Sequence, residues 1–316
     1  MADLRRQSGE WSSERPSERV DRAQLLLVGA LALAVLFVAL ALLLNTAIYT
    51  GNLATREAGV DSAGAIEYAS KARTAGEDAI RSVNYRNNSS HSALNTSLRS
   101  TLRIWDDAAA QHRAVVGDGA DVDLVGATNG TRIQQDDVTQ KFTTAGGVAN
   151  WTVASDPDLS GLRSLRLTVD ETTLASGPSD DAFHLNVASD AGTRNISVYD
   201  DSGPTVQVSE NGSVVDTCSP GSFSGDTFRI DVANASVGGS PCSNLSVVDD
   251  VGGDLEIAYT NGDEAGGRYT MVVDEPGVGP ASSDPYSTPA IYAADLHVTY
   301  RTPKLDYEAR IEVVPE

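Results

Sequence analysis

The chain has only two cysteines, Cys218 and Cys242, and both lie in turn-rich sequence that reads DTCSPGS and GSPCSNLS. An even pair of cysteines in a domain outside the cytoplasm is typical of one disulfide, which here closes a loop of about 25 residues. A pair of metal ligands is one alternative, although no histidine or further cysteine lies nearby, and two free thiols are the other. The sequence therefore predicts a Cys218–Cys242 disulfide.

The residues that acid–base or nucleophilic catalysis requires are scattered along the chain. The four histidines are His91, His112, His184 and His297. No HExxH, CxxC, GxGxxG or phosphate-binding loop occurs. The segment Gly221–Gly225 has Phe223 where the nucleophile elbow of a hydrolase requires serine. We therefore predict no enzymatic activity and no cofactor.

Carboxylates are dense enough to raise the question of cation binding. They cluster at Asp118, Asp121 and Asp123 and recur as adjacent pairs at 180–181, 200–201 and 249–250. None of these groups follows the ligand order of an EF-hand loop, in which glycine stands at position six and glutamate at position twelve. Solvated carboxylates explain the clusters, so no metal site is predicted; a calcium-loaded surface domain is the alternative.

Asparagine occurs in sequons more often than composition explains. The chain has 14 asparagines, and nine of them begin an Asn-x-Ser/Thr sequon. These nine candidate N-glycosylation positions are Asn87, Asn88, Asn95, Asn129, Asn150, Asn195, Asn211, Asn234 and Asn244. Chance alone would give only about three. The excess predicts an exported, glycosylated body, and Ser/Thr-rich loops without sugar are the alternative.

All of these residues follow one apolar stretch, residues 25–44. It reads LLLVGALALAVLFVALALLL and carries no charge over 20 residues. A helix rises about 1.5 Å per residue, so this stretch is long enough to cross the roughly 30 Å hydrocarbon core of a bilayer. Five arginines lie within residues 1–22, which favours a cytoplasmic tail. We therefore expect a single-pass cell-membrane protein with a cytoplasmic tail at 1–22, a transmembrane helix at 23–49 and an extracellular body.

The start of the apolar stretch has a further feature. The sequence RAQ at 22–24, directly before LLLVG at 25–29, resembles the class III signal of type IV pilins and pseudopilins. That resemblance implies removal of the tail by cleavage between Ala23 and Gln24. The whole chain also resembles a poorly characterised haloarchaeal family of single-span membrane proteins, which implies a membrane location. A signal anchor that is never cleaved is the alternative.

The charge of the chain is strongly negative and unevenly distributed. Net charge is −21, and residues 117–316 hold 32 of the 44 acidic residues but only 10 of the 23 basic ones. A polyanionic body repels nucleic acids and anionic lipids, which argues against both as its ligands. The Asp-rich, Lys-poor composition resembles that of haloarchaeal proteins, in which dense carboxylates keep the surface hydrated at high salt.

Residues 50–118 fit a helical stalk. An apolar stripe at heptad-like spacing runs through Leu94, Leu98, Leu102, Trp105, Ala109, His112 and Val116. The stripe predicts a helix that packs against the rest of the body, with a packed histidine at position 112. A coiled-coil or filament seam is the alternative interpretation.

From about residue 120 the apolar period changes to two. Alternation at 165–169, 183–187, 196–198, 206–208, 228–232, 255–259, 269–273, 296–300 and 307–313 predicts short strands. Turn signals such as Asn211-Gly212 separate them. Residues 119–316 are therefore predicted to form an acidic, antiparallel β-sandwich-like domain.

The expected fold class is α+β, with a transmembrane helix, a helical stalk and the β domain in that order. The expected function is that of a membrane-anchored extracytoplasmic protein, specifically a pilin-like or surface-assembly subunit without catalytic activity. A non-assembling anchored β-domain protein with a binding or cell-envelope role is the alternative. The expected partners are the lipid bilayer, like subunits, and pilus or secretion assembly proteins, with no nucleic acid among them.

Overall fold

The computed structural model describes residues 33–38, 40, 62–86, 89–177, 179–247, 253–281 and 284–315. The chain divides into two compact units, Met1–Ala63 and Gly64–Glu316. The predicted tail, 1–22, and most of the predicted transmembrane helix, 23–49, lie outside the described residues, although 33–38 and 40 are helical. Within the described ranges, no helix is both long enough and apolar enough to cross a membrane.

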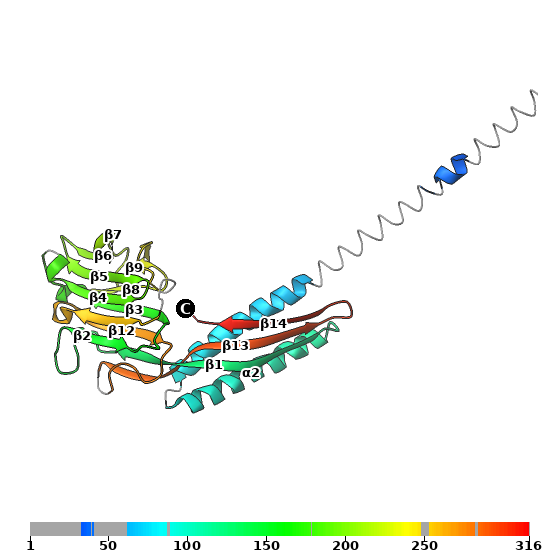
Figure 1. Ribbon diagram of the computed structural model, residues 1–316, viewed down its shortest axis with the longest axis horizontal. Coiled ribbons are helices and arrows are strands. Elements are labelled where there is room, and N and C mark those ends of the chain that lie inside the picture. Colours follow the sequence, from blue (N-terminus) through cyan, green and yellow to red (C-terminus); the bar gives the residue numbers. More distant parts are fainter. Residues whose placement is uncertain are drawn as a thin grey trace, which may run out of the picture. The chain divides into compact units, whose positions relative to one another are not determined.

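Two antiparallel β-sheets make up most of the second unit (Figure 1). The larger sheet has eight strands, in the spatial order β10 (Ser240–Pro241), β9 (Ser236–Val237), β8 (Thr227–Asp231), β3 (Leu162–Asp170), β12 (Gly266–Val273), β1 (Gly119–Gln135), β13 (Tyr286–Arg301) and β14 (Asp306–Val313). The smaller sheet has six strands, in the order β2 (Trp151–Ser155), β11 (Glu256–Thr260), β4 (Phe183–Ser189), β5 (Gly192–Asp200), β6 (Pro204–Glu210) and β7 (Ser213–Cys218).

The two sheets share one hydrophobic core, to which alternate residues of the strands contribute. In β3, for example, Leu165, Leu167 and Val169 are buried, while Arg166 and Thr168 between them are partly exposed. This is the burial pattern expected of a sheet with one face on a core. The predicted antiparallel β-sandwich is therefore confirmed.

A second hydrophobic core lies where β1 and β13 continue past the sandwich (Figure 1). Two helices cover this part of the larger sheet: the helix at 62–86, from Gly64 onward, and α2 (His91–Ala114). Ser90 caps α2, because its hydroxyl accepts a hydrogen bond from the Ala93 N–H at 3.2 Å. The larger sheet thus contributes to both cores, one shared with the smaller sheet and one shared with the helices.

Glycines allow the 62–86 helix to lie close to the sheet. A Cβ atom at Gly64 would lie 2.9 Å from the Tyr300 hydroxyl oxygen, and one at Gly76 would lie 3.0 Å from Cδ1 of Leu296. Glycine costs an exposed helix about 1 kcal/mol relative to alanine. At these two positions the cost is offset by the close packing that it permits.

A buried polar cluster joins the end of this helix to the sheet. The side-chain amide of Asn84 donates to the Ile291 carbonyl and accepts from the Ile291 N–H, each at 2.8 Å. The Arg163 guanidinium donates to the same carbonyl at 2.7 Å and to the Pro315 carbonyl at 3.0 Å. Burial lowers the pKa of Arg163 to about 10. Paired hydrogen bonds of this kind fix the helix at one position along β13, because sliding would leave buried groups unsatisfied.

The predicted apolar stripe of α2 is buried along only part of its length. Leu94, Leu98 and Leu102 are buried in the second core. His112 is exposed, and Val116 lies beyond the helix with 68% of its surface exposed. The prediction of a packed His112 is wrong, because a stripe at heptad spacing drifts about 20° per heptad around a straight helix and leaves the buried face.

Candidate functional site

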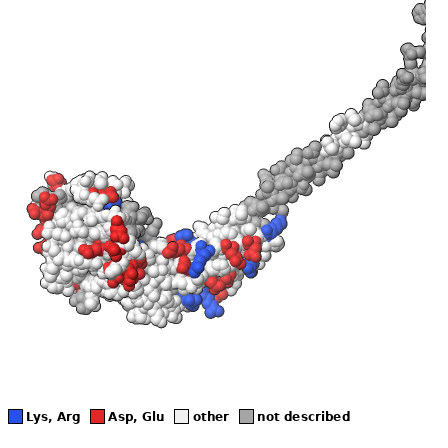
Figure 2. Space-filling model, in the orientation of Figure 1, with Lys and Arg blue, Asp and Glu red and all other residues white. Residues whose placement is uncertain are grey.

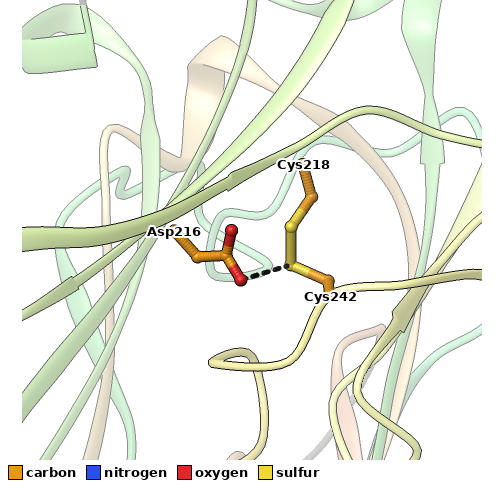
Figure 3. Close-up of side chains that lie close together, drawn as sticks. All are labelled: Asp216, Cys218 and Cys242. Atoms are coloured by element: carbon orange, nitrogen blue, oxygen red, sulfur yellow. Dashed lines mark hydrogen bonds between the residues drawn. A yellow bond between two sulfur atoms is a disulfide. The ribbon is translucent and has the colours of Figure 1, made fainter.

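The disulfide links the outer strands of the two sheets (Figure 3). Cys218 is the last residue of β7, and Cys242 directly follows β10. The sulfur atoms are 1.99 Å apart and the Cα atoms 5.9 Å apart. The predicted disulfide is confirmed, and it is consistent with an extracellular protein.

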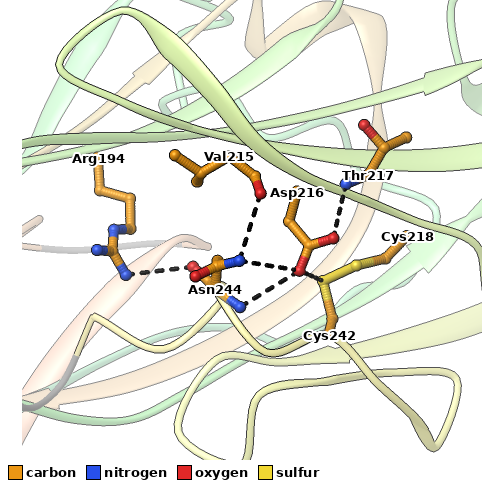
Figure 4. The surroundings of a disulfide bond; sticks show 7 residues. All are labelled: Arg194, Val215, Asp216, Thr217, Cys218, Cys242 and Asn244. Carbon is orange, nitrogen blue, oxygen red and sulfur yellow. Dashed lines mark hydrogen bonds between the residues drawn. A yellow bond between two sulfur atoms is a disulfide. The ribbon is translucent and has the colours of Figure 1, made fainter.

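Polar contacts around the disulfide hold the segment after β10 against β7 (Figure 4). Oδ2 of Asp216 accepts from the backbone N–H and from Nδ2 of Asn244, at 3.3 and 3.4 Å. Nδ2 of Asn244 also donates to the Val215 carbonyl at 3.3 Å. The Arg194 guanidinium donates to the Asn244 carbonyl at 3.1 Å. The side chain of Asn244 thereby satisfies a backbone carbonyl of β7, the strand at one edge of the smaller sheet.

The same carboxylate raises the question of a metal site. Among the described residues, Asp216, Cys218 and Cys242 are the one set of three or more potential metal ligands whose ligand atoms lie within 4.8 Å of one another. Sulfur binds metal ions as thiolate, and both sulfurs here are joined to each other. The donor set therefore does not fit a metal while the disulfide is intact.

Acidic side chains from α2 and β1 line a second feature, a surface groove. The groove is lined by Asp106 and Asp107 of α2, Asp121 and Asp123 of β1, and Arg99 and Arg103. Burial raises the pKa of Asp106; the hydrogen bond from the Val122 N–H opposes this increase, and repulsion from Asp121 adds to it. Asp121 is exposed, and partial desolvation by its neighbours raises its pKa, with repulsion from Asp123 as the next cause. Within the groove the carboxylates of Asp106, Asp121 and Asp123 therefore repel one another.

The sequence grouped these acids differently. It grouped Asp118, Asp121 and Asp123 as one cluster, whereas Asp121 and Asp123 lie on β1 and Asp118 accepts a hydrogen bond from the Tyr300 hydroxyl at 2.6 Å. Their neighbour Asp106 comes from α2, and its carboxylate accepts from the Val122 N–H at 2.8 Å. Asp106 lies close to Asp121 and Asp123 only because α2 and β1 run antiparallel to each other.

Replacement of Asp121 by asparagine is expected to stabilise the protein at neutral pH. The folded protein holds the Asp121 proton to a higher pH than the unfolded chain does, so the ionised carboxylate disfavours folding above the folded pKa. The benefit of Asp121→Asn should therefore be present at pH 7 and disappear near pH 3, where the carboxyl is protonated in both states. Thermal unfolding at the two pH values measures this.

A matched control for this substitution is Asp226→Asn, because Asp226 is exposed like Asp121 but lies in the turn before β8 and does not line the groove. It should leave the melting temperature unchanged at both pH values. A lower melting temperature for Asp121→Asn at pH 7, or an increase that persists at pH 3, would contradict the repulsion described for the groove.

His91 and His112 lie at opposite ends of α2, His184 lies on β4 and His297 lies on β13. The closest approach to a catalytic pair is on the outer face of the smaller sheet, where Nδ1 of His184 lies 2.8 Å from Oγ of Ser197. Ser197 donates its single hydroxyl proton to Oδ1 of Asn195, also at 2.8 Å. The hydroxyl proton of Ser197 is thus directed to Asn195 and not to the imidazole nitrogen, unlike that of a serine activated by a histidine.

The predicted modification sites are only partly described. Seven of the nine sequon asparagines lie in described residues, and Asn87 and Asn88 do not. The predicted cleavage site, Ala23–Gln24, is also outside the described residues. No protein-family model, curated protein or solved structure matches this chain.

Proposed function

We propose that this chain is a membrane-anchored extracytoplasmic protein that acts as a pilin-like or surface-assembly subunit without catalytic activity. The uncharged run 25–44 and the arginines of residues 1–22 support a single span with the tail in the cytoplasm. The disulfide supports an oxidising location for the body. The resemblance of residues 22–29 to the class III signal supports the pilin-like class.

The observation that carries this proposal is the firm attachment of the 62–86 helix to the sheet. This helix follows the apolar run in sequence, and its buried residues Tyr68, Ala72 and Ile80 lie in the second core. The Asn84–Ile291 pair of hydrogen bonds fixes its end to β13. The helix and both sheets are therefore held in one fixed arrangement, which suits a subunit of an assembly.

The acidity of the body supports the choice of partners. On the face seen in Figure 2, acidic side chains gather over the sandwich, while acidic and basic side chains both occur over the helical part. Repulsion between sandwich surfaces disfavours contacts between them. Like subunits and pilus or secretion assembly proteins would therefore meet the helical part, and the bilayer would hold the apolar run.

The orientation is tested by labelling intact cells with a membrane-impermeant maleimide. The native cysteines are joined in a disulfide, so single introduced cysteines report their own exposure. Ser100→Cys, on the exposed surface of α2, should be labelled in intact cells. Its control is the unchanged protein, whose two cysteines are joined in the disulfide and should stay unlabelled in intact cells. Protection of Ser100→Cys until the cells are lysed would contradict the proposal.

A further inference from the structure

The seven described sequon asparagines differ in exposure. Three of them, Asn95, Asn129 and Asn195, are half-buried on α2, β1 and β5. The other four are exposed: Asn150, Asn211, Asn234 and Asn244. A glycan is large and hydrophilic, so the folded protein accommodates it only where the amide nitrogen reaches solvent.

The half-buried asparagines use their amides within the fold. Nδ2 of Asn95 donates to Oδ1 of Asn129 at 3.0 Å, so two sequons bind each other between α2 and β1. Nδ2 of Asn195 donates to Oδ1 of Asn186 at 2.6 Å, next to Ser197 and His184 on the outer face of the smaller sheet. Because all three are half-buried, a glycan at any of them would displace neighbouring side chains, and at Asn95 or Asn195 it would also disturb a hydrogen bond that Nδ2 donates.

Two of the exposed asparagines also have an occupied amide nitrogen. Nδ2 of Asn234 donates to Oδ1 of Asp231 at 3.1 Å. Nδ2 of Asn244 donates to both the Val215 carbonyl and Asp216 beside the disulfide. A substituted amide keeps only one hydrogen, so a glycan at Asn244 would remove one of its two contacts, and at Asn234 the contact to Asp231 turns Nδ2 toward the protein and away from solvent.

In the remaining two asparagines, Asn150 and Asn211, the side-chain oxygen and not the nitrogen makes the hydrogen bond to the protein. Oδ1 of Asn150 accepts from the Asn261 N–H at 2.8 Å, and Oδ1 of Asn211 accepts from the Thr193 N–H at 3.1 Å. The carboxamide group is planar, so anchoring its oxygen on the protein turns Nδ2 away from that contact. Within the described residues neither Nδ2 donates a hydrogen bond.

The backbone supports the exposure of Asn211 in particular. Asn211 and Gly212 form the two-residue turn between β6 and β7, with φ of 49° and 81°. Positive φ at both positions is the geometry of a type I′ hairpin turn, and it places the asparagine at the tip. Asn150 immediately precedes β2.

We infer that Asn150 and Asn211 are the glycan-bearing positions among the described sequons. This inference rests on the proposed extracytoplasmic location. The co-reactant is an oligosaccharide on a lipid phosphate, used by a separate transferase. Nδ2 forms a bond to the anomeric carbon of the sugar, the bond from that carbon to the phosphate oxygen breaks, and the lipid phosphate and one amide proton leave.

The two positions share a structural role. Asn150 adjoins β2 and Asn211 adjoins β7, and these are the two outer strands of the smaller sheet. An outer strand exposes unpaired backbone groups that can pair with another chain. A glycan at each end of the six-stranded sheet shields both of its open edges from such pairing.

The test is glycopeptide mass spectrometry of the full chain isolated from its native membranes. Thr152→Val and Ser213→Ala each remove one sequon without changing the asparagine, and both positions are exposed. Each variant should lose one glycan, and the double variant should carry none on the described sequons. The controls Ser236→Ala and Ser246→Ala remove the Asn234 and Asn244 sequons and should leave the glycan mass unchanged.

Glycan at Asn95, Asn129 or Asn195, or loss of glycan in either control, would overturn the inference. So would a chain without any glycan at Asn150 and Asn211. Labelling of Ser100→Cys in the same intact cells separates the two proposals. If Ser100→Cys is labelled while Asn150 and Asn211 are bare, the inference fails and the proposed location stands; if Ser100→Cys is protected, the location itself fails.

Discussion

Replacing Phe142 by alanine is expected to lower the free energy of unfolding by about 3–5 kcal/mol. Phe142 is fully buried, and its ring lies 4.7 Å from the Phe183 ring and 6.0 and 6.1 Å from the rings of Tyr259 and Tyr269. Strands of both sheets contribute to this cluster, so Phe142→Ala leaves a cavity between the sheets that the surrounding rings cannot close.

Urea unfolding of the purified full chain measures this change as a lower midpoint at an unchanged slope. The matched control is Phe223→Ala, because the Phe223 side chain is 46% exposed and has its ring 6.0 Å from that of Phe228. We expect the control to cost about 1 kcal/mol or less. Equal losses for the two substitutions would contradict the position of Phe142 at the centre of the sandwich core.

Removal of the disulfide by Cys218→Ala with Cys242→Ala is expected to cost about 3 kcal/mol, because the unfolded chain regains the freedom of a loop of about 25 residues. The native contacts around Asp216 should hold the segment after β10 in place, so the fold should survive. Unfolding of the double variant without reductant, compared with the unchanged protein with and without reductant, measures the effect.

A second variant distinguishes the contribution of the disulfide to stability from that of the hydrogen bonds around it. Asn244→Ala removes the side-chain hydrogen bonds to Val215 and Asp216 but leaves the disulfide intact. It should cost about 1 kcal/mol. A larger loss for Asn244→Ala than for the double cysteine variant would show that the polar contacts, and not the disulfide, join the edges of the two sheets.

Much of the sandwich could be predicted from alternation alone. The pattern at 165–169 lies within β3, the pattern at 183–187 lies within β4, and Asn211-Gly212 forms the expected turn. These strands each have one face on the core, so burial imposes a period of two on the sequence. The disulfide could be predicted because the chain has a single cysteine pair.

Strand β1 could not be recognised in the same way. Register shifts at Leu124/Gly126 and Thr128/Asn129 interrupt its alternation. Its two ends also face different cores, one shared with the helices and one with the smaller sheet. No single period describes such a strand, so alternation did not predict a strand at 119–135.

Phe142 and the acidic groove were missed for a related reason. Phe142 lies between β1 and β2 in a segment without periodic structure, where burial leaves no pattern in sequence. The groove requires Asp106 and Asp121 to meet across α2 and β1. Long-range pairing of this kind follows from the tertiary fold and not from local spacing.

The first residue of the mature protein, determined by mass spectrometry on native membranes, tests the proposed pilin-like function most directly. The resemblance of residues 22–29 to a class III signal implies cleavage before the apolar run. The proposal predicts that the mature chain begins at Gln24. A chain that retains its tail and begins at Met1 or Ala2 would contradict it.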